Sequence, residues 1–238
     1  MPEKPAEAKP LITHGSLFAG IGGFDLGFER AGIKTVWQVE IDPFCRKVLE
    51  KHWPEVKRYG DIRDCRDMPH VDIVSGGFPC QPVSLAGKRR AQSDKRWLWG
   101  DFERAVCDLR PRFVVVENVP GLFTAGFGDV MGGLAALGLS AEWAVFSACE
   151  FGAPHTRERV FVVAYPPCES RRWKCGRIFQ QKDGNEKRDL RQWIVESQPV
   201  RVAHGIPNRL DRNSALGNAV APHIAEWIGR RIVENFNA

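Results

Sequence analysis

One short apolar run followed by two glycines constrains the fold of this chain more than any other stretch. Val71 to Val74 is typical of a strand buried in a covered sheet, and Gly76-Gly77 allows the backbone to turn sharply and approach a ligand. In open α/β sheets, ligands bind just beyond the carboxyl ends of the strands. Cys80 follows at such a position, between Pro79 and Gln81, and is therefore a candidate nucleophile. A lone cysteine is more often an inert buried thiol, so its neighbours decide between the two readings.

The rest of the chain alternates apolar runs typical of strands with amphipathic segments typical of helices. This alternation predicts an α/β fold with a doubly wound, mostly parallel sheet. We expect strands over residues 11–18, 34–39, 71–74, 113–119, 141–149 and 159–165, and helices over residues 24–31, 43–52, 97–109 and 222–235. The last two strands pair with each other, and the last helix packs back on the first part of the chain.

A glycine-rich turn, Phe18-Ala-Gly-Ile-Gly-Gly23, joins the first strand to the first helix. Such a turn lets a nucleotide approach the backbone closely, but many tight turns look alike. Glu40 follows about twenty residues later at the end of the second strand, where a carboxylate can accept bonds from both ribose hydroxyls. Asp61 could accept a hydrogen bond from the exocyclic amine of adenine, and a helix or turn cap is an equal alternative.

Glu117 stands at the carboxyl end of the strand over residues 113–119. A buried carboxylate is costly unless it is paired or protonated, so we expect a raised pKa. A raised pKa suits a general acid near neutral pH, and the alternative is a glutamate that caps a loop. Arg157 and Arg159 alternate at the entrance of the last strand, so both can point the same way.

Cysteine usage and hydropathy bear on the compartment. The seven cysteines include no C-x-x-C pair, which suits neither a disulfide framework nor a zinc site, and we expect free thiols and no metal. Residues 1–10 hold no apolar core for a signal peptide, and no apolar run of about 18 residues occurs. These features predict a soluble cytoplasmic protein without a membrane segment.

The formal net charge of +5 is concentrated in two stretches. One follows Cys80 and includes Lys88-Arg89-Arg90, and the other, residues 166–201, includes Arg171, Arg172 and Lys174. Basic faces are often only solvated surface, but two of them around a candidate site favour a polyanionic substrate.

The pattern also predicts how the chain divides. We expect a flexible N-terminus over residues 1–10 and a main domain made of residues 11–165 and 214–236. Residues 166–213, where aromatic residues are scattered among charges, are expected to form a small, irregular, basic subdomain.

The candidate motifs, in chain order, are Phe18-Ala-Gly-Ile-Gly-Gly23, Glu40-Ile-Asp42, Gly60-Asp-Ile62, Gly77-Phe-Pro-Cys-Gln-Pro-Val-Ser84, Glu117-Asn-Val119, Arg157-Glu-Arg159 and Leu216-Gly-Asn-Ala-Val220. This ordered set closely resembles the cytosine-C5 DNA methyltransferase family, whose methyl donor is S-adenosylmethionine. The resemblance covers nearly the whole chain and implies the Rossmann-like fold of methyltransferases. It further implies a restriction-modification type of DNA methylation.

The resemblance implies a set of cofactor contacts. The methionine end of S-adenosylmethionine would lie on the glycine-rich turn, at Phe18, Ala19, Gly20, Ile21, Gly22 and Gly23. Glu40 would hold the ribose beside Ile41, and Asp61 and Ile62 would hold the adenine. Pro79, Asn218 and Val220 would close the pocket.

The resemblance also implies the chemistry. The Cys80 thiolate would add to C6 of cytosine and activate C5 for methylation, while Glu117 acts on N3 and Arg159, supported by Arg157, neutralises O2. The target nucleotide must be flipped out of double-stranded DNA to reach the pocket. The implied DNA contacts are Gln81, Ser84, Lys88, Arg89, Arg90, Asn118, Arg171, Arg172 and Lys174. The base that removes the C5 proton is not identified by any motif.

Three departures from the family pattern qualify these expectations. His155-Thr156 replaces the glutamine that commonly precedes the arginine pair, and Val83 replaces an aromatic residue. The target-recognition region is unusually short, so we expect either a monomer with reduced sequence reading or a partner that supplies target recognition.

Three other functions remain open. An RNA cytosine-C5 methyltransferase of the same fold would share every motif. A non-catalytic DNA- or cofactor-binding relative could lose Cys80 or Glu117, and both are present. A nicotinamide-linked dehydrogenase could share the glycine-rich turn and Glu40 but has no need for the motif around Cys80.

Overall fold

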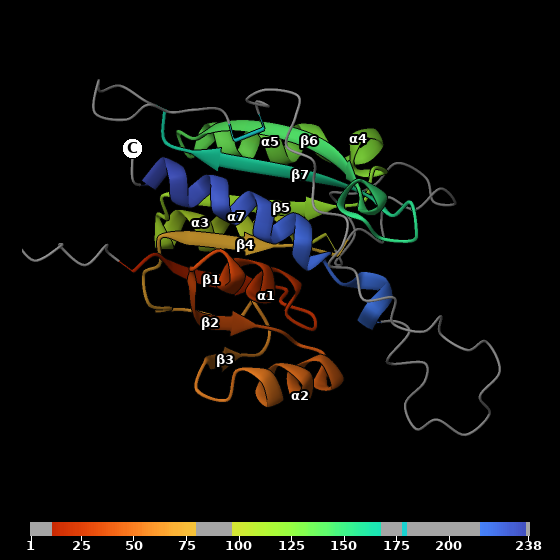
Figure 1. The fold of residues 1–238 in the computed structure, drawn as a ribbon. Coiled ribbons are helices and arrows are strands. Elements are labelled where there is room, and N and C mark those ends of the chain that lie inside the picture. Colours follow the sequence, from red (N-terminus) through yellow and green to blue (C-terminus); the bar gives the residue numbers. More distant parts are fainter. Residues whose placement is uncertain (1–10, 80–96, 168–177, 180–214, 237–238) are drawn as a thin grey trace, which may run out of the picture.

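The structure is a computed structural model that describes residues 11–79, 97–167, 178–179 and 215–236. These residues form an α/β fold around one sheet of seven strands (Figure 1). The strands are β1 (Thr13–Leu17), β2 (Lys34–Val39), β3 (Lys57–Tyr59), β4 (Ile73–Gly76), β5 (Phe113–Asn118), β6 (Ser140–Ser147) and β7 (Glu158–Tyr165). Their order in the sheet is β3-β2-β1-β4-β5-β7-β6.

The strand directions locate the place where a ligand can bind. β1 to β5 run parallel to one another, and β7 is antiparallel to both β5 and β6. From β1 the chain builds outward through β2 and β3, then returns to the other side of β1 with β4 and β5. The order therefore reverses between β1 and β4. Ligand crevices of open α/β sheets form at the carboxyl ends of strands at such a reversal.

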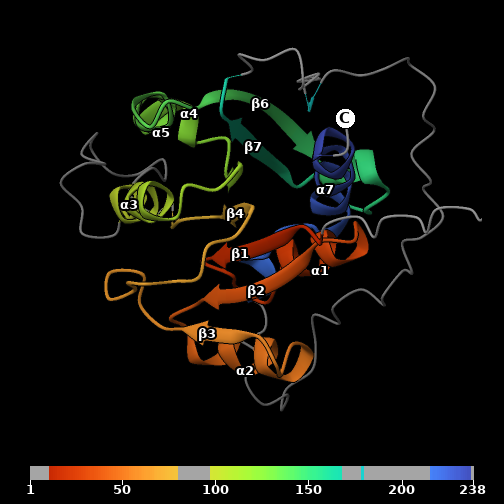
Figure 2. The ribbon, with the colours of Figure 1, turned by 90° about the vertical axis from the view of Figure 1, so that its left-hand side faces the viewer.

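Helices cover both faces of the sheet (Figure 2). One face carries α1 (Gly23–Arg30) and α7 (Pro222–Phe236), and the other carries α3 (Trp99–Leu109), α4 (Leu122–Ala125) and α5 (Phe127–Ala136). α2 (Pro43–His52) lies at the β3 end, and the short 3₁₀ helix η3 (Ala148–Phe151) follows β6. The expected doubly wound, mostly parallel sheet is thus confirmed.

Helices α4 and α5 were not expected from the sequence. α5 contains Gly128, Gly132 and Gly133, and each glycine costs a helix about 1 kcal/mol relative to alanine. Only Val130 and Leu134 of this helix are buried, so the apolar periodicity is weak. Tertiary packing beside α3 and β6 therefore supports a helix that local propensity does not specify.

The packing of α1 against α7 confirms that the last helix returns to the first part of the chain. A Cβ at Gly27 would lie 2.5 Å from both the Cβ of Ala225 and the carbonyl oxygen of Pro222. Glycine on α1 therefore lets the two helices approach closely. The apolar side of α7 is buried at Ile228 and Ile232.

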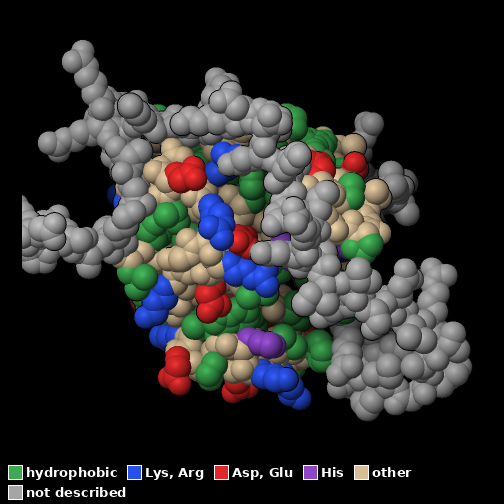
Figure 3. Space-filling view, in the orientation of Figure 1, with side chains coloured by type: hydrophobic (Ala, Val, Ile, Leu, Met, Phe, Trp, Pro, Cys, Tyr) green, Lys and Arg blue, Asp and Glu red, His purple; other side chains and the backbone are tan. Residues whose placement is uncertain are grey.

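The outer side of this layer carries mixed charge. On the face that α7 covers, Lys and Arg side chains lie beside Asp and Glu (Figure 3). Glu226 pairs there with Arg30 and Arg230. Such exposed pairs contribute little to stability. Because acidic side chains lie among the basic ones, the described residues of this face form no continuous basic surface.

A buried polar cluster lies inside the sheet, between β1 and its neighbours. Nδ1 of His14 lies 3.0 Å from Oγ1 of Thr35, and Nε2 lies 2.7 Å from Oγ of Ser75. Gln38 Nε2 donates to Oδ1 of the buried Asp25 over 2.9 Å. Burial lowers the pKa of His14 to about 3 and raises that of Asp25 to about 6. In both side chains burial shifts the pKa toward the neutral form, because a water-free interior disfavours charge.

A carboxylate on β6 fixes the only described residues between Pro167 and Ala215. Oε1 of Glu142 accepts hydrogen bonds from the backbone N–H of Ile178 (2.6 Å) and from the hydroxyl of Tyr165 (3.1 Å), and Oε2 accepts one from the N–H of Phe179 (3.0 Å). Ile178 is buried, and Phe179 stacks on Trp227 of α7. These two residues therefore belong to the core of the main sheet, while the rest of the expected subdomain over residues 166–213 lies largely outside the described residues.

The described part of the chain also bears on the compartment predictions. Cys45, Cys65, Cys107 and Cys149 are free thiols, and the other cysteines lie outside the described residues. Among the described residues, no helix is long and apolar enough to cross a membrane, and no group of three or more His, Cys, Asp or Glu could hold a metal ion.

Candidate active site

The glycine-rich turn takes a conformation that its sequence specifies. Phe18, Gly20 and Gly22 have φ angles of 52°, 57° and 88°, in the left-handed region. Glycine adopts this region without strain, which explains two of the three positions. The turn is held by bonds from Ala19 N to Val39 O (3.0 Å) and from Gly22 N to Ala19 O (2.9 Å). A side chain at Gly22 would also collide with the ring of Trp53.

Glu40 joins the loops that follow β1 and β2. One carboxylate oxygen accepts the N–H of Gly20 and the other accepts the N–H of Asp42, each at 2.7 Å. A carboxylate has about four lone-pair sites, so each oxygen keeps capacity for a ligand hydroxyl. The expected ribose contact stays a prediction that this geometry permits.

Asp61 caps a turn, which is one of the two roles that the sequence left open for it. Its carboxylate accepts the backbone N–H of Arg63 at 2.9 Å and forms an ion pair with the Arg63 guanidinium. These hydrogen bonds from Arg63 lower the pKa of Asp61, so the carboxylate is ionised at neutral pH. Arg63 itself was not expected at the site. Its position two residues after a turn aspartate does not by itself distinguish it from a surface arginine.

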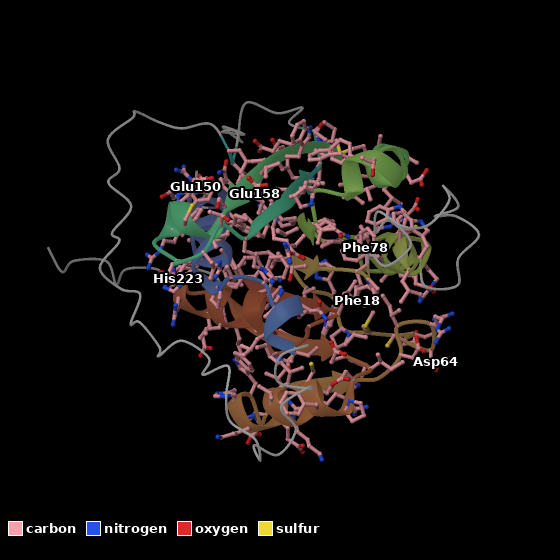
Figure 4. All side chains as sticks on the ribbon, turned by 90° about the vertical axis from the view of Figure 1, so that its right-hand side faces the viewer. Phe18, Asp64, Phe78, Glu150, Glu158 and His223 are labelled. Atoms are coloured by element: carbon pink, nitrogen blue, oxygen red, sulfur yellow. The ribbon has the colours of Figure 1, made fainter. Side chains whose placement is uncertain are left out.

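A cavity of about 740 Å³ opens where the strand order predicts it, at the carboxyl ends of the parallel strands. Figure 4 looks onto this edge of the sheet, with Phe18 and Phe78 near its centre. The expected cofactor residues that line the cavity are Phe18, Gly20, Glu40, Ile41, Asp61, Ile62, Pro79 and Asn218. The structure thus gathers side chains from five separate loops around one space.

Other expected cofactor residues do not line this cavity. They are Ala19, Ile21, Gly22, Gly23 and Val220. Gly22 and Gly23 shape the site instead, because a side chain at Gly23 would collide with the carbonyl oxygen of Val220. The cavity is also lined by residues that were not among the expected cofactor contacts, among them Asp42, Cys45, Arg63 and Leu98.

Glu117 reaches the opposite end of the same cavity. Its carboxylate is buried, and this burial raises its pKa to about 7, although Arg159 and Arg157 act in the other direction. Nε of Arg159 lies 2.9 Å from Oε1, yet this oxygen has no directed hydrogen bond. The raised pKa confirms the expectation for Glu117, whose carboxylate lies at the cavity beside the guanidinium of Arg159.

The two glycines at the end of β4 have a steric role. Neither Gly76 nor Gly77 has a positive φ, so neither glycine is needed for a left-handed conformation, and Gly77 lines the cavity. A Cβ at Gly76 would lie 2.5 Å from the carbonyl oxygen of Leu17, and one at Gly77 would lie 2.7 Å from Oε2 of Glu117. Glycine is required because neighbouring groups fill the space.

Asn118 fixes the base of the loop that leads to Cys80. Its side-chain amide donates to the carbonyl oxygen of Phe78 over 3.3 Å and accepts the N–H of Val119 at 2.9 Å. The ring of Phe78 packs against Trp97 and Trp99. The structure therefore holds the chain firmly up to Pro79, at the cavity wall.

The remaining expected substrate residues lie outside the described part of the chain. These are Cys80, Gln81, Ser84, Lys88, Arg89, Arg90, Arg171, Arg172 and Lys174. Their roles stay predictions. Cys80 directly follows Pro79, which lines the cavity.

Arg157 directly precedes β7 and Arg159 is the second residue of this strand, and the two guanidiniums take different partners. Both act electrostatically on Glu117. Arg159 lines the cavity, whereas Arg157 is not among the described residues that line it. The guanidinium of Arg157 donates instead to the carbonyl oxygens of Gly217 and Ala219.

Comparison with known proteins agrees with this geometry. The family model described as C-5 cytosine-specific DNA methylase matches residues 12–201, which is most of the chain. The chain therefore belongs to this family.

Individual relatives are similar over part of their length. The chain is 38% identical to the Type II methyltransferase M.NgoBI of Neisseria gonorrhoeae over 156 residues, which are 63% of this chain and 49% of that protein. It is 37% identical to M.BsuFI of Bacillus subtilis over 163 residues, which are 66% of this chain and 40% of that protein. The chain thus spans less than half the length of these relatives.

A solved structure supports the fold. The S. pombe Dnmt2 methyltransferase matches with a TM-score of 0.56 and 20% identity, over 73% of this chain and 58% of that chain. This likeness shows a shared α/β fold.

Proposed function

We propose that this protein is a DNA (cytosine-5-)-methyltransferase that uses S-adenosylmethionine. One observation carries the proposal. A single cavity joins Glu40 and Asp61, which suit an adenosine, to the buried acid Glu117, and it reaches Pro79, after which Cys80 follows. Membership of the C-5 cytosine-specific family supports the same reaction.

The residues at one end of the cavity fit an adenosine. Its volume of about 740 Å³ is within the usual range for small-molecule sites. Ile41 lines it with 62% of its surface exposed, an apolar wall on which a flat purine can pack. Glu40 would accept from the ribose and the ionised Asp61 from the adenine amine. When bound, S-adenosylmethionine supplies an electrophilic methyl group on a sulfonium.

At the other end, the side chains fit the activation of a cytosine. C5 of cytosine is a weak nucleophile, and addition of the Cys80 thiolate to C6 converts the ring into an enamine. The electron pair displaced by this addition is drawn toward N3 and O2. Glu117, whose pKa of about 7 leaves a large protonated fraction at neutral pH, donates to N3. Arg159 neutralises O2 from the same cavity.

The product is released by two further steps. After C5 has gained its methyl group, a base removes the C5 proton, and the electron pair of that bond restores the double bond as the Cys80 sulfur leaves C6. Every step requires the ring to leave the stacked duplex and enter the cavity. Two relatives are named Type II methyltransferases, and their names support a role in restriction-modification for this chain.

Substrate and cofactor are tested separately. Calorimetry should show binding of S-adenosylhomocysteine and none of NAD; the reverse result would favour a dehydrogenase. Tritiated methyl transfer should then label duplex DNA in preference to single-stranded DNA and transfer RNA. Preferential labelling of transfer RNA would support the RNA methyltransferase alternative, and cofactor binding without any transfer would support the non-catalytic one.

A further inference from the structure

Arg157 occupies an unusual position beside the candidate active site. It is two residues before Arg159, yet its guanidinium faces backbone carbonyls and is not part of the cavity lining. Nη1 donates to the carbonyl oxygen of Gly217, and Nη2 donates to that of Ala219 over 3.0 Å. The two carbonyls flank Asn218, which lines the cavity.

The short segment that carries Asn218 is held from two sides. Arg157 binds its carbonyls on one side. On the other side, the carbonyl oxygen of Val220 lies so close to Gly23 that a Cβ there would collide with it. Asn218 itself is exposed, so the side chain has little packing of its own to fix it. Its position at the cavity wall therefore depends on how its neighbours are held.

The chemistry of Arg157 suits this task. A guanidinium presents donors in a rigid fork, so it can bridge two carbonyls at once, whereas an ammonium acts as a single point. Desolvation by burial is the main cause that lowers the pKa of Arg157, followed by the nearby Arg159, while Glu117 raises it. Arg157 is thus a partly buried cation whose donors face the segment around Asn218.

We propose that Arg157 is a positioning residue of the cofactor pocket, which holds the carbonyls of Gly217 and Ala219 so that Asn218 stays at the cavity wall. This inference rests on the proposed function, because it takes S-adenosylmethionine as the ligand of that cavity. It assigns different tasks to the two arginines. Arg157 acts on cofactor affinity, and Arg159, which lines the cavity beside Glu117, acts on the reacting base.

The test compares the two arginines by the same conservative change. In Arg157→Lys, affinity for S-adenosylhomocysteine, measured by calorimetry, should fall by about ten- to a hundredfold, because one charge-assisted bond to a backbone carbonyl is lost. The KM for S-adenosylmethionine should rise while kcat at saturating cofactor changes little. In Arg159→Lys, cofactor affinity should stay at the wild-type level while kcat falls.

Two controls separate positioning from a general loss of structure. Arg230→Lys, on the exposed side of α7, should leave cofactor affinity unchanged. The more drastic Arg157→Ala should bind the cofactor weakly, and added methylguanidinium should restore part of that affinity because it supplies the missing fork. Thermal unfolding of each variant without ligand shows whether the variant is folded. If Arg157→Ala does not fold, the cofactor affinity of Arg157→Lys alone tests the inference.

The outcomes are distinct. A folded Arg157→Lys variant that binds S-adenosylhomocysteine with wild-type affinity but has a lowered kcat would overturn the inference. Arg157 would then act on the reacting cytosine and not on the cofactor pocket. Failure of the wild-type protein to bind S-adenosylhomocysteine would instead overturn the proposed cofactor.

Discussion

A Cβ on Gly77 would lie 2.7 Å from Oε2 of Glu117, so a larger residue at the end of β4 must displace the carboxylate that follows Val116 on β5. The two strands pair in parallel up to Gly76 and Val116, one residue before this contact. Glu117 can therefore be buried directly beside the loop that leads to Cys80. Its burial is the cause of its raised pKa, so the glycine contributes to the acid's protonation state as well as to packing.

Gly77→Ala is expected to displace the Glu117 carboxylate. The added methyl group should lower the free energy of unfolding by about 1–3 kcal/mol, and methyl transfer at saturating cofactor should fall strongly. Denaturant unfolding and single-turnover kinetics measure the two effects. Gly132→Ala is the control, because open space surrounds that position on α5 and alanine should stabilise the helix. An active, fully stable Gly77→Ala variant would show that the contact relaxes freely.

The raised pKa of Glu117 predicts how stability depends on pH. The pKa rises from 4.5 to about 7 on folding, so its contribution to stability is full below about pH 4.5 and is lost as the pH rises through 7. In the ligand-free protein, Glu117→Gln removes this loss. The variant should match the wild type at pH 4.5 and exceed it by up to about 3 kcal/mol at pH 8.5. Urea unfolding at both pH values measures the difference, and an equal difference at both would contradict the assigned pKa.

Asp61 and Arg63 should contribute unequally to cofactor binding. Removing the carboxylate in Asp61→Ala should weaken S-adenosylhomocysteine binding by about tenfold or more, because the adenine amine loses a charged acceptor. Arg63 is mostly exposed, so its ion pair is worth little, and Arg63→Ala should change binding only slightly. Calorimetry on both variants tests this. A larger loss in Arg63→Ala would mean that the guanidinium itself touches the cofactor.

Glu142 should stabilise the fold through Ile178 and Phe179. In Glu142→Gln, an amide NH₂ would face one of the two backbone N–H groups that now donate to the carboxylate. We expect a loss of about 1–3 kcal/mol in the free energy of unfolding. Glu234→Gln, at an exposed position on α7, is the matched control and should change nothing. Equal stability of the two variants would show that these hydrogen bonds are replaced by water.

The sequence predicted those elements whose ends carry strong local signals. β2 and α2 have the expected bounds, because Pro43 opens the helix and Asp42 caps it through the N–H of Cys45. Glu117 was also identified, since a carboxylate at the end of an apolar strand is costly wherever the strand is buried.

Other features depend on contacts between distant segments and could not be read from local patterns. The Gly77–Glu117 contact joins two strands, and the bonds from Arg157 reach about sixty residues along the chain to Gly217 and Ala219. α5 is specified by packing and not by propensity. The partner of Asp61 was local, but nothing in the motif distinguished Arg63 from an ordinary surface arginine.

The central claim is that Cys80 attacks C6 of a cytosine in the cavity that Glu117 lines. Duplex DNA carrying 5-fluorocytosine tests it most directly, because fluorine cannot leave C5 as a proton does and the enzyme remains attached. With S-adenosylmethionine present, the wild-type protein should form a covalent complex that survives denaturation, and peptide mapping should place the bond at Cys80. Cys80→Ala should form none while still binding S-adenosylhomocysteine. Methyl transfer to unmodified DNA at the wild-type rate by Cys80→Ala, or turnover on 5-fluorocytosine DNA without any covalent complex, would contradict the account.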